Sequence, residues 1–406
     1  MPPASPRPLW AGRTAALLGI VLVAINLRTA VAAVSPIVDR ISDELPIDAP
    51  TLGLIGAAPP IAFAVSGLLA PLFSRALGLE RALMVAILAM TVGHLGRALA
   101  PNTTLLLVGT IVALLGIGVG NVLLPPIIKR YFPDRVGLIT SGYATLMAIS
   151  TAVPALVAVP VADAAGWRVS LGSWFLVAFV ALIPWLVQLA AHRAAGGAPE
   201  DPDQGAPLAG GLWRSPTAWA ITAVFAVSSL NAYAAFAWLP SIVRDLAGSS
   251  EAEAGALLAL FAIAGLPASV IVPILASRMR DASPLAFAGV AFFLLGYGGL
   301  LLAPAPLTAL WVLLIGLGPM LFPLALVLIN LRTRGHRQSV ALSGFVQGIG
   351  YVAGCSGPVL VGLMHDASGE WTGAIVFLLS TNIVAVIAGF LLRRPVFVDE
   401  EVARRR

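Results

Sequence analysis

The sequence predicts an all-α membrane protein of twelve transmembrane helices, arranged as two six-helix repeats. Three observations predict this fold class: the composition, the spacing of uncharged apolar runs, and an internal repeat. Of the 406 residues, 59% are apolar and 11% are charged, whereas a soluble protein carries roughly 25% charged residues. A soluble protein of this length could not bury so much apolar surface, so the composition indicates that lipid surrounds the chain.

Twelve largely uncharged runs are each long enough to span a membrane. A helix needs about 20 apolar residues to cross roughly 30 Å of hydrocarbon, and its backbone satisfies its own hydrogen bonds there. The first six runs cover residues 14–36, 51–74, 81–100, 103–127, 137–161 and 169–190. The other six cover residues 216–240, 253–276, 284–303, 306–329, 339–363 and 372–392. A membrane barrel would show alternating segments of about ten residues instead.

Similarity between the first and the last six runs indicates a duplication. Leu114–Gly118 returns as Leu314–Gly318, and Asp163–Trp167 returns as Asp366–Trp371, at offsets that stay between 198 and 204. Six spans per repeat give both repeats the same orientation in the membrane. We therefore expect an N-terminal six-helix bundle over 1–190, a flexible linker rich in Gly, Pro and charge over 191–215, and a C-terminal bundle over 216–406.

The basic residues predict the orientation of the chain. Nineteen of the 24 Lys and Arg residues lie on the side of the termini, and three lie on the other side, namely Arg40, Arg168 and Arg244. The positive-inside rule therefore places both termini in the cytoplasm. The net charge of +5 thus reflects topology and does not indicate a nucleic-acid partner.

Motifs in the first, third and fourth runs resemble a known family. They are Asn26-Leu27-Arg28 with Pro36, Arg97, and residues 116–120 (GIGVG) leading to 126–130 (PIIKR). These motifs are similar to those of the cyanate permease and nitroimidazole transporter family of the major facilitator superfamily. The resemblance implies the major facilitator fold. It also implies a monomeric, multi-pass carrier of the bacterial inner membrane, with a small anion or small polar heterocycle as its substrate.

Residues 75–81 (RALGLER) weakly resemble the loop motif that follows the second helix of facilitators. Ser74 stands where that motif carries Asp, so the resemblance predicts that one charge contact of the usual loop latch is absent.

Arg28 is the strongest candidate for a functional charge. All nineteen carboxylates lie outside the centres of the runs, so no buried counter-charge for a cationic substrate is available. Arg28 lies close to the middle of the first run, where a charged side chain costs roughly 3 kcal/mol or more. We therefore predict that Arg28 binds an anionic substrate. The alternative is a structural role, with hydrogen bonds to carbonyls or snorkelling to the interface. Asn26 is expected to hydrogen-bond a neighbouring helix.

Further polar residues lie on spans that border the transport path in facilitators. These are Asn121, Tyr143, Asn231, Tyr233, Gln347 and Tyr351, which we predict to contact the substrate together with Arg28. Gln347 and Tyr351 share a helix face with glycines, so helix packing explains that face as well as a binding site does. His94 and Arg97 belong to the peripheral third span. They are candidates for a proton or gating role, although Arg97 is more simply a snorkelling anchor.

Other functional classes lack the residues that they need. Cys355 is the single cysteine, and the four histidines are scattered, so we predict no metal, no cofactor and no enzymatic activity. The sequence therefore predicts a secondary-active transporter that works by alternating access, with a coupling proton or counter-anion. The alternative is a multidrug efflux facilitator with an apolar cavity. Substrate identity, transport direction, and the choice among symport, antiport and uniport stay open.

Overall fold

The computed structural model describes residues 13–47, 49–194 and 211–404, and within them twelve helices are long and apolar enough to cross a membrane. This confirms the predicted fold class. The first six spans are α1 (Thr14–Asn26) with α2 (Thr29–Ala32), α4 (Ala49–Leu77), α5 (Leu79–Ala98), α6 (Thr103–Tyr131), α7 (Val136–Ala165), and α8 (Trp167–Gly172) with α9 (Trp174–Ala194). The other six are α10 (Pro216–Ala247), α11 (Glu251–Arg278), α12 (Ser283–Leu302), α13 (Thr308–Leu317) with α14 (Leu321–Leu331), α15 (His336–Ser368) and α16 (Thr372–Leu392).

Local sequence explains where several helices begin and end. The Asn102 side chain accepts a hydrogen bond from the Leu105 amide at 2.9 Å and starts α6. Ser250 and Glu253 form a capping box at the start of α11. Gly248, with a left-handed φ of 69°, ends α10. The predicted linker, residues 191–215, falls mostly on residues 195–210, which lie outside the described residues.

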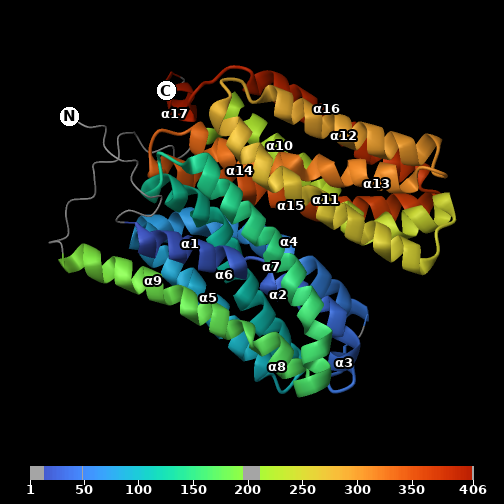
Figure 1. The fold of residues 1–406 in the computed structure, drawn as a ribbon, viewed down its shortest axis with the longest axis horizontal. Helices are drawn as coiled ribbons and strands as arrows, with labels where there is room; N and C mark the ends of the chain where they lie inside the picture. Colours follow the sequence, from blue (N-terminus) through green and yellow to red (C-terminus); the bar gives the residue numbers. More distant parts are fainter. Residues whose placement is uncertain (1–12, 48, 195–210, 405–406) are drawn as a thin grey trace, which may run out of the picture.

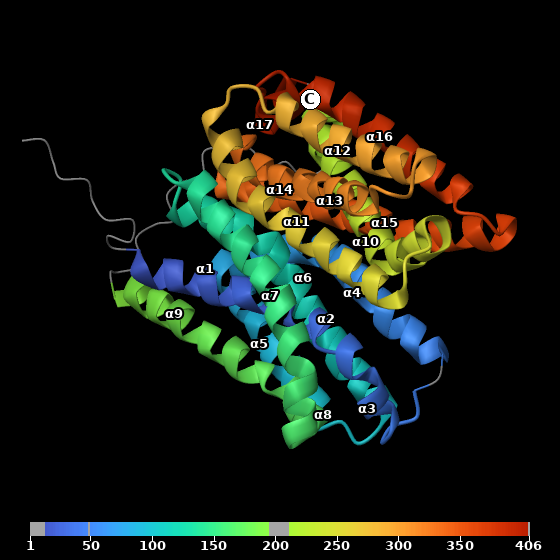
Figure 2. The same cartoon turned by 45° about the vertical axis from the view of Figure 1, so that its right-hand side comes forward.

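The helices form two lobes that lie side by side (Figure 1, Figure 2). Helices α1 to α9 form one lobe, in which α5 packs on α6 and α1 packs on α7 and α9. Helices α10 to α16 form the other, in which α10 packs on α15 and α16. We call them the first and the second lobe.

The short C-terminal helix α17 (Val398–Arg404) binds the second lobe near its basic end. A carboxylate oxygen of Glu401 accepts a hydrogen bond from the Thr217 amide at 3.1 Å, and the other accepts one from the Thr217 hydroxyl at 2.7 Å. The Ser215 hydroxyl donates to Glu401 at 2.5 Å. Glu401 therefore satisfies the free amide at the start of α10, where negative charge also suits the helix dipole.

The two lobes touch near the end where Lys and Arg gather. α15 packs on α4 and α6, and α11 packs on α7. Gly67 of α4 and Gly348 of α15 lie so close that a Cβ added to Gly67 would stand 2.3 Å from the Gly348 Cα atom. Small residues thus allow the two backbones to approach one another, as is common between membrane helices.

Hydrogen bonds to backbone carbonyls add to this contact between the lobes. The Lys129 ammonium, at the end of α6, donates to Asn330 O at 2.6 Å and also to the carbonyl of Thr333. These carbonyls belong to the end of α14 and the turn after it, where a positive charge also complements the helix dipole. The Ser343 hydroxyl of α15 donates to Val122 O of α6 at 2.7 Å.

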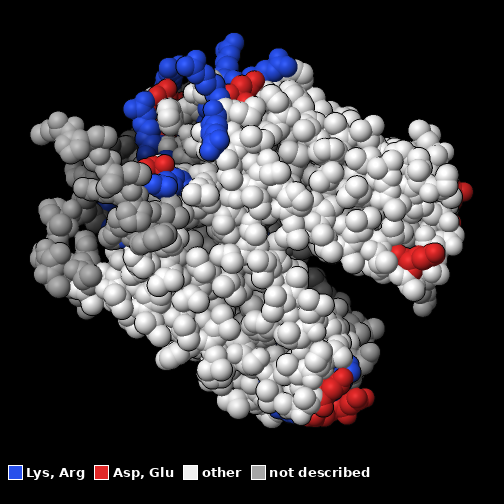
Figure 3. All heavy atoms as spheres, in the orientation of Figure 1, with Lys and Arg blue, Asp and Glu red and all other residues white. Residues whose placement is uncertain are grey.

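A cleft separates the lobes at the opposite end (Figure 3). It opens away from the cluster of Lys and Arg side chains, and acidic side chains lie near its mouth. The lobes are therefore closed at the basic end and open at the other.

We predict that Gly67→Ala destabilises the protein although alanine favours helices more than glycine does. The added methyl group would meet the Gly348 backbone, so the lobes must shift, at a cost of about 1–3 kcal/mol. Gly142→Ala is the matched control, because a Cβ at Gly142 has no atom within 4 Å. Thermal unfolding of both variants in detergent checks this. Equal midpoints for the two would show that the lobes do not touch at Gly67.

Candidate functional site

The first span is interrupted at Leu27 and Arg28, so the prediction of one continuous helix over 14–36 is wrong there. α1 ends at Asn26 and α2 begins at Thr29, and Arg28 has φ −131° and ψ −4°. Side chains satisfy the carbonyls that the interruption frees. The Thr29 hydroxyl donates to Asn26 O at 2.9 Å, and the Arg28 guanidinium donates to Leu27 O at 3.1 Å. Interrupted helices of this kind commonly form binding sites in transporters.

The sequence predicts that Asn26 bonds a neighbouring helix, but among the described residues its side chain bonds only its own helix. Its amide nitrogen donates to Leu22 O of its own helix at 2.8 Å, because Asn26 is the last residue of α1 and its side chain folds back along it.

Arg28 lies at the boundary between the lobes and is half-buried. Its guanidinium carbon is 5.4 Å from the centre of the Phe63 ring, a favourable cation–π contact. Phe63, on α4, contacts Tyr351 of the second lobe, with 5.1 Å between the ring centres. The phenols of Tyr351, Tyr233 and Tyr143 lie near the Arg28 guanidinium, with Tyr351 the first among them. The structure thus brings together four of the seven predicted substrate contacts.

Two of these phenols are buried without a hydrogen-bond partner. The hydroxyls of Tyr143 and Tyr351 make none among the described residues, and both residues are 1% exposed. A buried hydroxyl without a partner loses roughly 1–3 kcal/mol. Beside a guanidinium, the two hydroxyls form a polar surface that a small ligand with hydrogen-bonding atoms would satisfy.

Gln347 and Asn121 lie at the contact between the lobes. The Gln347 amide nitrogen donates to Asn121 O at 3.1 Å and to the Ser343 hydroxyl at 2.9 Å. The Asn121 side chain is buried, and neither of its polar atoms has a partner in the described part of the chain. In this conformation Gln347 therefore holds the lobes together.

Asn231 points to a different neighbour than predicted. Its amide nitrogen donates to Val227 O at 2.8 Å and to the Thr381 hydroxyl of α16 at 3.1 Å. Because α16 packs on α10 within the second lobe, this arrangement separates Asn231 from the group around Arg28.

His94 and Arg97 are fully buried between helices of the first lobe. His94 Nε2 lies 3.2 Å from the Thr29 hydroxyl, so His94 contacts the interrupted turn. Arg97 is 0% exposed, and its guanidinium makes no hydrogen bond within the described residues. The prediction that Arg97 snorkels to the interface is wrong, because α6 packs against its side chain. A Cβ added to Gly109 of α6 would stand 3.2 Å from the Arg97 Cγ atom.

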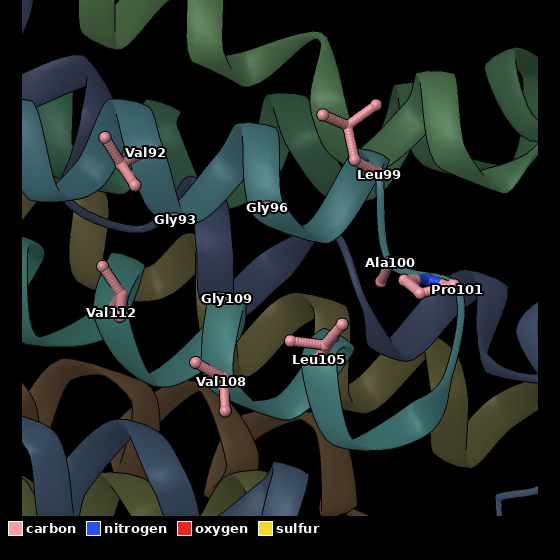
Figure 4. A pocket seen from close by; sticks show the side chains of 10 residues that line it. All are labelled: Val92, Gly93, Gly96, Leu99, Ala100, Pro101, Leu105, Val108, Gly109 and Val112. Carbon is pink, nitrogen blue, oxygen red and sulfur yellow. The ribbon is translucent and has the colours of Figure 1, made fainter.

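A groove of about 290 Å³ lies between α5 and α6, and its lining includes Gly96, the residue before Arg97 (Figure 4). Its lining comes from Val92, Gly93, Gly96, Leu99, Ala100, Pro101, Leu105, Val108, Gly109 and Val112. These side chains offer no charge or hydrogen-bonding group. The polar cluster around Arg28 is therefore the better candidate site.

Two aromatic residues of the candidate site escaped the sequence analysis. Phe63 contacts Arg28 and Tyr351, and Phe225 of α10 contacts Tyr351 edge-on at 5.1 Å between ring centres. Both lie on spans that border the path in facilitators, but phenylalanine is too common in membrane helices to stand out. No three His, Cys, Asp or Glu residues gather into a metal-binding group in the part of the chain that the structure describes.

Comparisons with known sequences identify relatives over almost the full chain. A family model described as Major Facilitator Superfamily matches residues 17–318. The uncharacterized transporter YycB of Bacillus subtilis (strain 168) is 35% identical over 92% of this chain and 92% of its own. The 2-nitroimidazole transporter of Escherichia coli (strain K12) is 33% identical over 96% of this chain and 97% of its own. The cyanate transport protein CynX of Escherichia coli (strain K12) is 27% identical over 87% of this chain and 91% of its own.

Solved structures share the fold. The proton:xylose symporter XylE superposes with a TM-score of 0.74 at 15% identity, over 97% of this chain and 99% of its own. FucP, solved in the outward conformation, superposes with a TM-score of 0.71 at 14% identity, over 93% of this chain and 98% of its own. At such low identity, these likenesses bear on the fold alone.

We predict that Tyr351→Phe and Gln347→Ala affect stability differently. The Tyr351 hydroxyl makes no hydrogen bond of good geometry to a described residue and only lies near the Arg28 guanidinium, so Tyr351→Phe should change the ligand-free thermal midpoint little. Gln347→Ala removes the bond to Asn121 O and should lower stability by about 0.5–1.5 kcal/mol. Differential scanning fluorimetry in detergent measures both. A lower midpoint for Tyr351→Phe would mean that its hydroxyl bonds protein and is not free for a ligand.

Proposed function

Because this chain belongs to the major facilitator superfamily and is a multi-pass membrane transporter, we propose that it carries a small anion or small polar heterocycle by alternating access. The observation that carries this proposal is the half-buried Arg28 guanidinium beside the phenols of Tyr143, Tyr233 and Tyr351. Two relatives whose names give a substrate, a 2-nitroimidazole transporter and a cyanate transport protein, fit the same class.

The distribution of carboxylates supports an anionic substrate. In the described spanning helices, every Asp and Glu lies within three residues of a helix end, as Glu80 and Asp163 do. Arg28 therefore has no carboxylate at its depth, and its charge is free to pair with a ligand. Arg28 presents a planar fork of donors suited to a carboxylate, nitro group or similar acceptor.

The basic residues and the cleft together suggest the state of the transporter. With the basic end in the cytoplasm, the cleft of Figure 3 opens to the outside. The N-terminal bundle 1–190 and the C-terminal bundle 216–406 then rock about Arg28, and the inward-open state requires the bonds of Lys129, Ser343 and Gln347 to break. We propose that the protein works as a monomer in the bacterial inner membrane.

Efflux of flat aromatic compounds is the second candidate. The rings of Phe63, Phe225 and Tyr351 contact one another, and such a surface also suits an uncharged aromatic molecule. The two functions differ in their need for the Arg28 charge, so one variant separates them.

Arg28→Gln should weaken binding of cyanate or 2-nitroimidazole by about a hundredfold, and Arg28→Lys by about tenfold, because charge and fork geometry contribute separately. Thermal shift of the purified protein measures this, since a ligand at 100 times its dissociation constant stabilises by about 2.7 kcal/mol. Arg244→Gln, which removes an exposed charge, is the control. Unchanged affinity in folded Arg28→Gln would reject the anion site and favour the efflux candidate.

We predict that the pH dependence of transport is set by the ionisation of the substrate and not by a titrating group of the protein. An inside-negative potential opposes anion entry by about 2.3 kcal/mol per charge per 100 mV, so uptake needs a cotransported proton, an exchanged anion or a neutral substrate. Without a carboxylate at the centre of the spans, we expect the pH dependence of uptake to track the pKa of the substrate. Proteoliposomes with a clamped potential and two congeners of different pKa test this. A profile that stays the same for both and disappears in His94→Gln would make His94 the proton carrier.

A further inference from the structure

We infer that His94 is a positioning residue for Arg28. The inference rests on the proposed role of Arg28, and it assigns the buried histidine a task other than proton transfer. In this arrangement, the bond from His94 to Thr29 holds the interrupted turn of the first span in the shape that aims the guanidinium at the boundary between the lobes.

The interrupted turn is held from two sides. Thr29, the residue after Arg28, is 0% exposed, and its hydroxyl lies 3.2 Å from His94 Nε2 of α5. On the α6 side, a Cβ added to Gly120 would stand 3.3 Å from Leu27 Cδ2, so Leu27 is in close packing contact with α6. Arg28 therefore lies between one residue fixed by packing and one fixed by a hydrogen bond.

The direction of the hydrogen bond depends on the tautomer of His94. A hydroxyl has one hydrogen, and Thr29 donates it to Asn26 O at 2.9 Å. The Thr29 oxygen then accepts from His94 when the imidazole carries its hydrogen on Nε2; with the hydrogen on Nδ1, facing the Leu171 backbone, Nε2 is the acceptor instead. An amide side chain can supply a donor or an acceptor, whereas an apolar side chain of similar size supplies neither.

The bond matters because the turn has few constraints of its own. At Leu27 and Arg28 the regular helical pattern is lost, and the Leu27 amide bonds Ala24 O at 3.3 Å. Without the Thr29 contact, a rotation at Arg28 would move its guanidinium away from the Phe63 ring and the three phenols. Small misplacements of a charged group are known to cost much of its effect on a ligand.

Cys355 offers a direct reporter of this geometry. It is the single cysteine of the chain and is half-buried on α15. Seven residues, or two helical turns, separate it from Gly348, so it faces the first lobe from a point nearer the open end of the cleft. The Tyr233 phenol lies near both the Arg28 guanidinium and the Cys355 thiol, so the thiol belongs to the surroundings of the Arg28 site without contacting the guanidinium.

The experiment compares two thiol reagents of opposite charge on the full-length protein in detergent. A sulfonate-bearing and a trimethylammonium-bearing methanethiosulfonate each form a mixed disulfide with Cys355 and release methanesulfinate. The ratio of their rates, divided by the ratio for free 2-mercaptoethanol, cancels the intrinsic reactivity of the thiol. It therefore reports the local electrostatic potential.

We expect the sulfonate reagent to be favoured about tenfold in the unaltered protein, and to lose that advantage in Arg28→Gln. Thr29→Val and His94→Leu should each reduce the advantage at least about threefold. The double variant should reduce it no further than Thr29→Val alone, because Thr29→Val already removes the bond to His94 together with the one to Asn26 O. His94→Gln, which keeps a donor, should retain it. Cys355→Ser should not react.

The variants distinguish the proposed Arg28 site from the proposed positioning role of His94. If Arg28→Gln removes the advantage but Thr29→Val and His94→Leu keep it, the positioning role is wrong and the Arg28 site stands. Equal loss in His94→Gln and His94→Leu would also overturn the hydrogen bond as the cause. If Arg28→Gln changes nothing, the guanidinium does not face the cleft, and both proposals fail. Should His94→Leu not fold, His94→Met, a second apolar replacement, takes its place, because Thr29→Val alone also removes the bond to Asn26 O.

Discussion

The structure depends on one constraint, which is that lipid offers no hydrogen bonds to the backbone. Twelve helices satisfy that constraint within themselves, and the interruption at Leu27 and Arg28 violates it at the depth of the candidate site. The Thr29 hydroxyl and the Arg28 guanidinium satisfy the freed carbonyls by donating hydrogen bonds to them. The same side chains thereby acquire fixed directions, so a local defect in the helix becomes a means of presenting a charge between the lobes.

Among the described residues, several hydrogen bonds that join the lobes at the closed end run to backbone carbonyls. Lys129 bonds carbonyls at the end of α14, and Ser343 and Gln347 bond carbonyls of α6. Such contacts are individually modest, which is consistent with the proposed opening of this interface during transport.

Charge within the membrane is concentrated in the first lobe. Arg28 and Arg97 both lie there, without a carboxylate at their depth among the described residues, yet they differ in surroundings. Arg28 is half-buried beside phenols of both lobes, whereas Arg97 is fully covered by its own lobe. Of the two, Arg28 is therefore the residue that we propose to meet a substrate, and Arg97 lies near His94 within the first lobe.

The sequence by itself determined the twelve spans, the major facilitator fold and Arg28 as the charge of the candidate site. Each membrane helix satisfies its own hydrogen bonds, so local composition decides where it lies, and a charge among apolar residues stands out in any sequence. Only the tertiary structure decided that Gln347 bonds Asn121 across the lobes, that Asn231 turns to α16 and that Arg97 is buried. Those outcomes depend on which helix faces each side chain. Sequence spacing predicts such a face only for a regular helix with known neighbours, and the first span is not regular at Arg28.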